Sequence, residues 1–227
     1  MNSRREEIGA NVGVVRRRIA ESAARVGRKP EEITLIAVTK TYPVGDIEIL
    51  HDLGLEDFAE NRDREGREKS AVVPARWHFQ GQIQSNKISS IASWAEVVHS
   101  LDNPRHARKL ASSVADRRNL SVFIQVSLHP QPGRGGIAPQ DLSPLAEFVL
   151  SQPQLRLEGL MAVAPLGEDP QSAFARLARI HSVFRQQFPS ASSLSAGMSG
   201  DFEVAIEHGA THVRIGSSIL GSRPHLG

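Results

Sequence analysis

The chain contains no cysteine, which excludes disulfide bonds, thiolate metal ligands and a cysteine nucleophile. Aromatic residues are scarce as well, at 5% of 227 residues, and Tyr42 is the single tyrosine. No apolar run reaches the roughly 18 residues that a membrane span needs. Charged residues follow Met1 closely, where a signal peptide would have an apolar segment. We therefore expect a cytoplasmic protein that does not enter a membrane.

Neither sign of charge dominates, because 27 Lys and Arg residues nearly balance 25 Asp and Glu residues, a formal net charge of +2. The densest basic cluster, residues 16–18, lies in a helical pattern, where consecutive side chains spread around the circumference. This is not the concentrated basic stripe of a nucleic-acid-binding protein, so we expect no such partner. Cysteine is absent and only one pair of the nine histidines, His208 and His212, has a spacing of four residues, so we expect no metal site.

Strand and helix patterns alternate along most of the chain. Apolar residues at spacings of three and four predict a first helix over about residues 3–26, ended by Gly27. Short, largely apolar runs then predict strands at residues 33–38, 57–60, 76–80, 97–100, 121–127, 155–163, 193–197 and 212–215. Helical patterns separate these runs, and the longest covers residues 171–188.

Eight strands that alternate with helices indicate an α/β fold with a parallel sheet. A closed (β/α)8 barrel of the TIM type and an open doubly wound sheet both fit this order. No glycine-rich dinucleotide fingerprint follows the first predicted strand, which favours the barrel. We predict that residues 1–227 form a single domain, a (β/α)8 TIM-type barrel with an extra N-terminal helix.

Lys40 ends the first predicted strand, where a buried β-branched run gives way to a loop. Desolvation at such a place favours the neutral amine, which is the nucleophile of Schiff-base chemistry. A solvated charge at a strand end is the alternative for this stretch taken alone. The chain has only five lysines, and the other four lie in connecting, loop or charged helical segments: Lys29, Lys69, Lys87 and Lys109.

Two turns rich in glycine and serine follow the seventh and eighth predicted strands. Ser199 stands in the first turn at an expected helix N-cap, and Gly216 and Ser217 lie in the second. Barrels often bind phosphate at these two loops, through hydroxyls and backbone N–H groups. Ordinary strand-to-helix loops are the alternative. Since a closed barrel brings its first and eighth strands together, a phosphorylated aldehyde could reach Lys40 from these turns. A sugar phosphate in an aldolase and pyridoxal 5′-phosphate both meet this description.

Arg214, at the end of the eighth predicted strand, helps to separate these two ligands. It would lie where the pyridine ring of the cofactor would be, between the phosphate turns and Lys40. A guanidinium only donates hydrogen bonds and stays charged, so beside the ring nitrogen it disfavours protonation there. That weakens the ring as an electron sink and argues against transaminase-like chemistry. An ion pair at the barrel rim is the alternative role for Arg214.

Seven blocks of the chain resemble the YggS-type pyridoxal phosphate homeostasis proteins, a family similar to the barrel domain of bacterial alanine racemases. The blocks are AVTKT at 37–41, FAEN at 58–61, WHFQG at 77–81, QSNK at 84–87, GLM at 159–161, GMS with an aspartate at 197–201, and VRIG at 213–216. They occur in the family's order, and the resemblance covers about residues 8 to 223. A barrel that binds pyridoxal 5′-phosphate is what this resemblance implies.

The resemblance also implies a set of cofactor-binding residues. Lys40 would hold the cofactor as a Schiff base, and Arg214 would face the pyridine nitrogen. Ser199, Gly216 and Ser217 would hold the phosphate. The remaining members would lie around the cofactor: Asn61, His78 and Met198, with a packed strand-end histidine as the alternative for His78.

Some positions depart from the family pattern. Arg62 stands where a tyrosine is usual, and Arg134 where a lysine is usual. Gln80 and Gln82 replace more apolar residues. Arg62 and Arg134 lie outside the cofactor core of the pattern, so they leave the cofactor prediction in place.

Three functions fit these residues. The resemblance implies a protein that carries or buffers the cofactor with little or no turnover, with apo forms of cofactor-dependent enzymes as its expected recipients. Because a short barrel can stand alone, we expect a monomer. Tyr42 follows the same strand as Lys40, so it is poorly placed to act as a second base on the opposite face of the cofactor. The alternatives are an amino-acid racemase or lyase of low activity and, less favoured, a Schiff-base aldolase that acts on a sugar phosphate.

Overall fold

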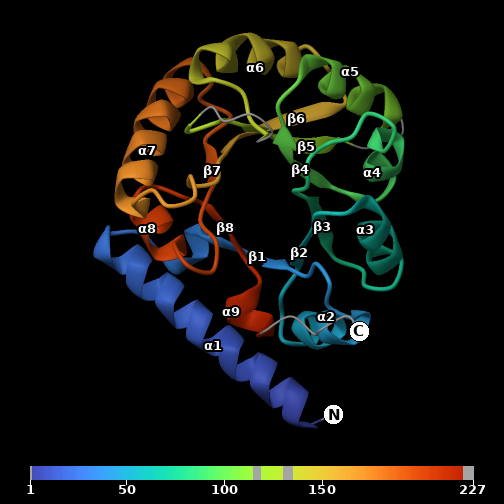
Figure 1. The fold of residues 1–227 in the computed structure, drawn as a ribbon, viewed down its shortest axis with the longest axis vertical. Coiled ribbons are helices and arrows are strands. Elements are labelled where there is room, and N and C mark those ends of the chain that lie inside the picture. The colour runs from blue at the N-terminus through green and yellow to red at the C-terminus, as the bar shows by residue number, and fades with distance from the viewer. Residues whose placement is uncertain (1, 115–118, 130–134, 222–227) are drawn as a thin grey trace.

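Eight parallel strands form a closed barrel in the computed structural model, which describes residues 2–114, 119–129 and 135–221. The barrel follows the order of the sequence, and the pairing of β1 with β8 closes it (Figure 1). The strands are β1 (Thr34–Val38), β2 (Asp57–Glu60), β3 (Arg76–Phe79), β4 (Val97–Leu101), β5 (Leu120–Gln125), β6 (Leu155–Met161), β7 (Ser193–Ser195) and β8 (His212–Ile215). All the predicted strands are present, and their ends differ from the prediction by at most two residues.

The helices form an outer layer around these strands (Figure 1). They are α1 (Asn2–Arg25), α2 (Val44–Asp52), α3 (Asp63–Ser70), α4 (Ile88–Trp94), α5 (Pro104–Ser113), α6 (Leu142–Leu150), α7 (Pro170–Gln187), α8 (Phe202–Glu207) and α9 (Ser217–Leu220). Short 3-10 turns at Pro30–Glu32 and Pro139–Asp141 precede β1 and α6. The predicted α/β barrel of the TIM type is therefore confirmed. No helix in the described ranges has the length and apolar character of a membrane span.

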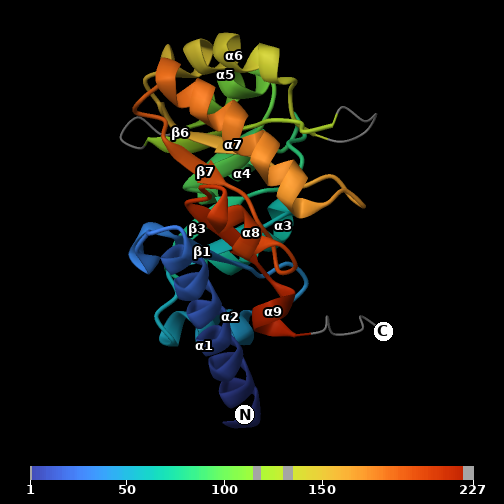
Figure 2. The same ribbon diagram turned by 90° about the vertical axis from the view of Figure 1, so that its left-hand side faces the viewer.

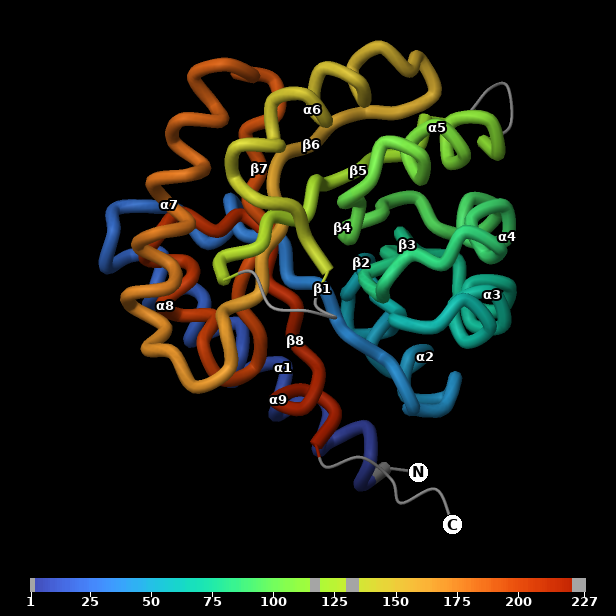
Figure 3. Tube along the Cα trace, turned by 45° about the horizontal axis from the view of Figure 1, so that its top comes forward, coloured from blue at the N-terminus to red at the C-terminus, as the bar shows by residue number. Residues whose placement is uncertain are grey.

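The predicted N-terminal helix, α1, occupies the position of a missing barrel helix. A helix after β8 would normally stand between α8 and α2, but α9 has only four residues. α1 packs against α8, α9 and α2 instead, so the first and last helices lie side by side (Figures 2 and 3). Its buried face carries the apolar residues that predicted it: Ile8, Val12, Val15, Ile19 and Ala23. α1 is therefore part of the barrel's outer layer.

Arginines on the polar sides of α1 form ion pairs with the helices beside it. Arg4 Nη2 donates to Asp46 of α2 at 2.6 Å, and Arg18 Nε donates to Glu203 of α8 at 2.6 Å. Arg5 pairs with Asp52 of α2, and Arg25 pairs with Glu207 of α8. Arginines therefore anchor this helix to the barrel, and Arg18 of the basic cluster at residues 16–18 has a structural role.

The interior of the barrel contains polar side chains where branched apolar residues usually predominate. His78, His99, Ser195 and Arg214 are all buried. His99 on β4 and Ser195 on β7 are in hydrogen-bond contact at 2.9 Å, although these strands are not neighbours, so the contact crosses the interior. The main apolar core lies elsewhere, between the strands and the helices.

Candidate functional site

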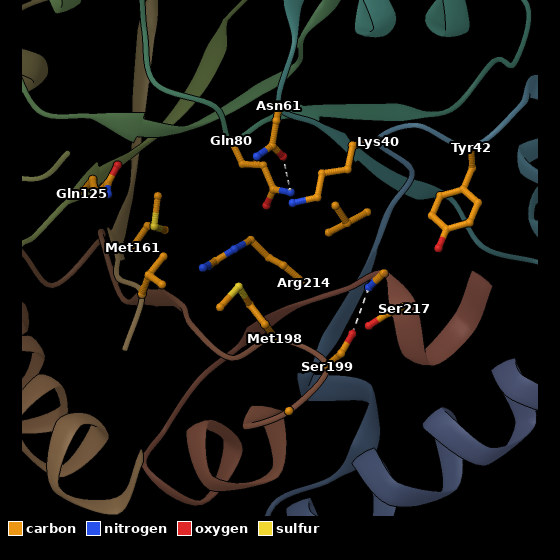
Figure 4. Close-up of a pocket in the computed structure, with 14 residues that line it drawn as sticks. Lys40, Tyr42, Asn61, Gln80, Gln125, Met161, Met198, Ser199, Arg214 and Ser217 are labelled. Atoms are coloured by element: carbon orange, nitrogen blue, oxygen red, sulfur yellow. Dashed lines mark hydrogen bonds between the residues drawn. The ribbon is translucent and has the colours of Figure 1, made fainter. Parts of the chain in front are cut away.

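A cavity of about 310 Å³ opens at the C-terminal ends of the strands (Figure 4), within the size range of small-ligand sites. It brings together most of the residues predicted for the site: Lys40, Asn61, Met198, Ser199, Arg214, Gly216 and Ser217. Further lining residues were not foreseen as site members: Val38, Tyr42, Gln80, Gln125, Met161 and Val163. The structure thus gathers these side chains in one place, and their role towards a ligand stays a prediction.

Lys40 lies two residues beyond the end of β1 and is half-buried. Its side chain extends into the cavity towards Asn61 and Gln80 (Figure 4). The next residue, Thr41, has a φ of 71°, a left-handed conformation that is uncommon for a residue with a side chain. The chain therefore turns sharply just after the lysine.

A buried network centred on Lys69 holds this turn in place. Lys69 Nζ donates to Thr39 O at 2.8 Å, to Glu60 Oε1 at 2.6 Å and to Glu65 Oε2 at 3.2 Å. Glu65 Oε2 also accepts a hydrogen bond from Thr41 N at 2.8 Å, and Thr39 Oγ1 donates to Glu60 Oε1 at 2.6 Å. The residues on both sides of Lys40 are thus fastened to α3.

The sequence placed Lys69 in a charged helical stretch and gave no sign of this role. The structure buries it to 6% exposure, against a Glu60 side chain that is fully buried. Burial raises the pKa of the Glu60 carboxyl, and the adjacent Lys69 charge counteracts that rise. A buried carboxylate paired with a buried ammonium depends on its partner far more than a surface pair does.

The turns after β7 and β8 meet at Ser199. Its Oγ accepts hydrogen bonds from Gly216 N and Ser218 N, each at 3.3 Å. A Cβ at Gly216 would lie 3.1 Å from Val38 O, so the glycine lets this turn approach the end of β1. Two backbone N–H groups that converge on one oxygen form a small anion-binding arrangement.

The expectation that Ser199 caps a helix was wrong. α8 begins at Phe202, and Asp201 occupies the N-cap position. The Asp201 carboxylate accepts a hydrogen bond from Met198 N at 2.6 Å, which closes the loop on itself. That closure leaves the Ser199 hydroxyl facing the turn after β8 instead of the start of α8.

Arg214 is a buried cation that lines the cavity, and only 4% of its surface is exposed. Nη1 donates to Ser195 Oγ at 2.7 Å, and Nη2 donates to Ala162 O at 3.1 Å. Burial lowers the pKa of the guanidinium to about 10, which leaves it protonated at neutral pH. Within the described ranges no carboxylate hydrogen-bonds to Arg214, so the alternative of an ion pair at the rim does not hold.

Asn61 follows β2 directly and is oriented by Gln80, whose Nε2 donates to Asn61 Oδ1 at 3.0 Å (Figure 4). A Cβ at Gly81 would lie 2.0 Å from Asn61 O, so only glycine allows the chain after β3 to pass so close. Gln80, which departs from the family pattern, therefore lines the cavity and orients Asn61 through a hydrogen bond. Gln82 is exposed.

His78 does not line this cavity, which corrects the expectation that it would. The neighbouring Trp77 and Phe79 pack into the apolar core outside the barrel, so His78 points into the interior. Gln80 lies two residues further along the same face and takes the position at the cavity. His78 lines instead a second cavity of about 340 Å³, shared with Arg76 and Glu96. The alternative stated for His78, a histidine packed on a strand, therefore describes its place.

Of the two remaining departures from the family pattern, Arg62 lies within the described residues and does not line the cavity. Arg62 is exposed and pairs with Glu65 at 3.5 Å. Arg134 lies outside the described residues. Tyr42 does line the cavity, and its hydroxyl donates to Gly221 O at 2.6 Å.

The fold and the site together define a barrel with a lysine after its first strand and converging backbone N–H groups at its last two turns. Residues 11–224 match the family described as the alanine racemase N-terminal domain, and the chain belongs to this family. Among solved structures, an alanine racemase of Corynebacterium glutamicum has a TM-score of 0.73 at 15% identity, over 98% of this chain and 62% of that chain. At that identity the likeness shows the fold alone.

Within this family, the chain belongs with the pyridoxal phosphate homeostasis proteins. The relative of that name from Corynebacterium glutamicum is 43% identical over 206 residues, which are 86% of this chain and 93% of the relative. The structure of PipY from Synechococcus elongatus, solved with PLP bound, has a TM-score of 0.78 at 32% identity, over 89% of this chain and 100% of that chain. The resemblance stated from the sequence blocks is therefore confirmed.

Proposed function

We propose that this protein binds pyridoxal 5′-phosphate in the cavity and carries or buffers the cofactor, as the names of its relatives indicate. The observation that carries the proposal is the meeting of three groups in one cavity. These are the amine-bearing Lys40, the buried cation Arg214, and the N–H groups that converge on Ser199. An aldehyde, a ring nitrogen and a phosphate are the complementary groups of this cofactor.

Each predicted residue has a part that suits its chemistry. The cofactor would supply an aldehyde, and Lys40 would hold it through its amine as a Schiff base, with loss of water. Ser199, Gly216 and Ser217 offer hydroxyl and backbone donors to the phosphate. Arg214 offers N–H donors and no acceptor, so it disfavours a proton on the pyridine nitrogen. The fit is supported by the cavity volume and by the absence of a carboxylate hydrogen-bonded to Arg214 within the described ranges.

We further propose that the protein turns over little or no substrate and acts as one cofactor-binding unit over residues 1–227. The Tyr42 hydroxyl, which a second-base mechanism would need, donates to a backbone carbonyl. Delivery to apo enzymes, a monomeric state and a cytoplasmic location are predictions of the same proposal. A racemase or lyase of low activity is its competitor, and turnover assays with alanine and serine decide between the two.

The first experiment is an absorbance spectrum of the purified protein with and without added pyridoxal 5′-phosphate. We expect the wild type to show a Schiff-base band that borohydride reduction fixes, and peptide mapping to find the modification on Lys40. Lys40→Ala should lose the band. Lys29→Ala, at an exposed lysine that does not line the cavity, is the matched control and should keep it.

The proposal has two ways to fail. A wild-type protein that gives no band with excess cofactor would remove pyridoxal 5′-phosphate as the ligand. A band that persists in Lys40→Ala, with the label spread over other lysines, would remove Lys40 as the anchor.

A further inference from the structure

A row of hydrogen bonds crosses the barrel interior from Arg214 to the N-terminal ends of β2 and β3. Arg214 Nη1 donates to Ser195 Oγ at 2.7 Å, and Ser195 Oγ lies 2.9 Å from His99 Nδ1. His99 Nε2 lies 2.8 Å from His78 Nδ1, and His78 Nε2 lies 2.8 Å from Asp57 Oδ1. We call this row the interior chain. Its members come from five different strands.

With both histidines neutral, the Asp57 end of the interior chain fixes the direction of its bonds. A carboxylate only accepts, so His78 donates to it from Nε2 and accepts at Nδ1 from His99 Nε2. His99 Nδ1 then accepts from the Ser195 hydroxyl, whose oxygen accepts from Arg214 because a guanidinium only donates. The reverse order would turn an unprotonated His78 nitrogen towards that carboxylate.

Both histidines are neutral in this arrangement, in agreement with their surroundings. Burial lowers the pKa of His99 well below its ordinary value, and the positive Arg214 adds to the effect. Burial also lowers the pKa of His78, although the nearby Asp57 opposes the shift. At the far end, burial of the Asp57 carboxyl would raise its pKa, but hydrogen bonds from His78 and Arg76 leave it below the ordinary value.

The interior chain bears on how the buried charge of Arg214 is stabilised. Arg214 is buried without a hydrogen-bonded carboxylate in the described ranges, and the Asp201 carboxylate favours its charged form only through space. A buried charge without a hydrogen-bonded counter-charge is costly. Each link from Ser195 to His78 turns its acceptor side towards Arg214, so the dipoles align with the positive charge. Bonds aligned in this way in a low-dielectric interior polarise one another.

We propose that Ser195, His99 and His78 are positioning residues, which connect the Asp57 carboxylate to Arg214 through aligned dipoles and so hold the guanidinium in one place against the cavity. This proposal rests on the proposed function only for its consequence: the interior chain would set the affinity for pyridoxal 5′-phosphate and the absorbance of the bound cofactor. His78 then acts on the site from a distance and not as a lining residue.

The first test needs neither a variant nor the cofactor. Nitrogen-15 NMR of the histidine side chains in the wild-type protein reports the protonation of each ring nitrogen. We expect His78 and His99 to be neutral at pH 7 with the proton on Nε2. Either ring carrying its proton on Nδ1 would overturn the proposed direction of the interior chain.

The second test breaks the interior chain beside Arg214. Ser195→Ala removes the link and leaves Arg214 its bond to Ala162 O. We expect the Arg214 side-chain NMR signals to show faster guanidinium rotation, cofactor affinity to fall on the order of tenfold, and the bound-cofactor absorbance maximum to shift. Ser121→Ala is the matched control, because Ser121 is a buried strand serine that donates to Glu158, outside the interior chain. It should change none of these readouts.

A second variant covers the case in which Ser195→Ala does not fold. His99 stacks on Phe123 with ring centroids 4.5 Å apart, so His99→Phe keeps an aromatic ring there and removes both nitrogens. The same three changes are expected. If either folded variant keeps wild-type Arg214 signals and a wild-type cofactor spectrum, the interior chain does not position Arg214. If the wild type binds no cofactor, the proposed function fails, while the NMR readouts still decide this proposal.

Discussion

Lys69 shows how a residue outside the cavity can determine the shape of the site. Its ammonium donates hydrogen bonds to Thr39 O, Glu60 and Glu65, and Glu65 also accepts a hydrogen bond from Thr41 N. The backbone on both sides of the site lysine therefore depends on one side chain of α3. Because the network is buried, water cannot replace the lost partner when one member is removed.

We predict that Lys69→Met destabilises the protein by about 3 kcal/mol, since it leaves the buried Glu60 carboxyl without its counter-charge. Cofactor affinity should also fall, because the turn that carries the site lysine loses its anchor. Chemical denaturation and cofactor titration measure the two effects. Lys109→Met, at an exposed helical lysine, is the control and should change stability by less than about 0.5 kcal/mol.

An unchanged cofactor affinity in Lys69→Met would mean that the turn holds its shape without α3. The double variant Lys69→Met with Glu60→Leu adds a second measurement. Removing the uncompensated carboxyl should recover part of the lost stability without recovering affinity, because the bonds to Thr39 and Glu65 remain absent.

Residues at strand ends could be predicted from the sequence, and residues that act through tertiary contacts could not. Lys40 and Arg214 each close an apolar run, and barrel topology places both at one end. Burial of Lys69 depends on Glu60, which approaches only when α3 packs on β2. His78 illustrates a different limit. The alternation of side chains along a strand predicts that His78 points into the barrel. It does not predict how far from the cavity His78 lies along the barrel axis. Gln80, two residues later on the same face, is the residue that lines the cavity.

At the scale of elements, the strands were predictable because most of them are short runs rich in apolar residues between polar turns. The role of α1 was not. Its helical period and apolar face were clear, but its position depends on α9 being short and on contacts with α8 and α2. Such contacts join the two ends of the chain, and a local pattern does not encode them. The N-terminal helix was therefore predicted as an addition, whereas it completes the outer layer.

We predict that the buried face of α1 contributes measurably to stability of the whole barrel. Val15 is fully buried and the adjacent Val14 is 42% exposed, so the same substitution can be compared at neighbouring positions. Val15→Ala should cost about 2 kcal/mol, from two lost methyl groups and the cavity left behind. Val14→Ala should be near neutral, since alanine favours the helix and little surface is uncovered. Urea denaturation of both variants measures the difference.

The contrast between these two valines decides whether α1 is integral to the barrel. Equal effects would mean that α1 separates from the barrel before the rest unfolds, and a biphasic transition in Val15→Ala would support that reading. One cooperative transition with a lowered midpoint is the outcome that we expect.

At the scale of the whole molecule, the fold keeps several histidines neutral by burying them. Burial lowers the pKa of His212 and of His181 to about 4 each, and it also lowers the pKa of His78 and His99. These residues lie on different strands and on α7, so the effect is a property of the barrel and not of one site. An unfolded chain would bind protons at all of these rings near pH 6.5.

The pH dependence of stability follows from this difference. Between pH 6.5 and about 4 the unfolded chain binds protons that the folded protein excludes, so stability is greatest above pH 6.5 and falls as the pH is lowered through this window.

His181 is suited to a test because it lies on α7, outside the barrel interior, and its Nε2 has no hydrogen-bond partner in the described ranges. We predict that His181→Gln reduces the loss of stability between pH 7 and pH 4 by on the order of 2 kcal/mol, after allowance for solvent screening. Urea denaturation of the wild type and His181→Gln across this pH range measures the difference, and parallel profiles for the two proteins would show that His181 is protonated in the folded protein.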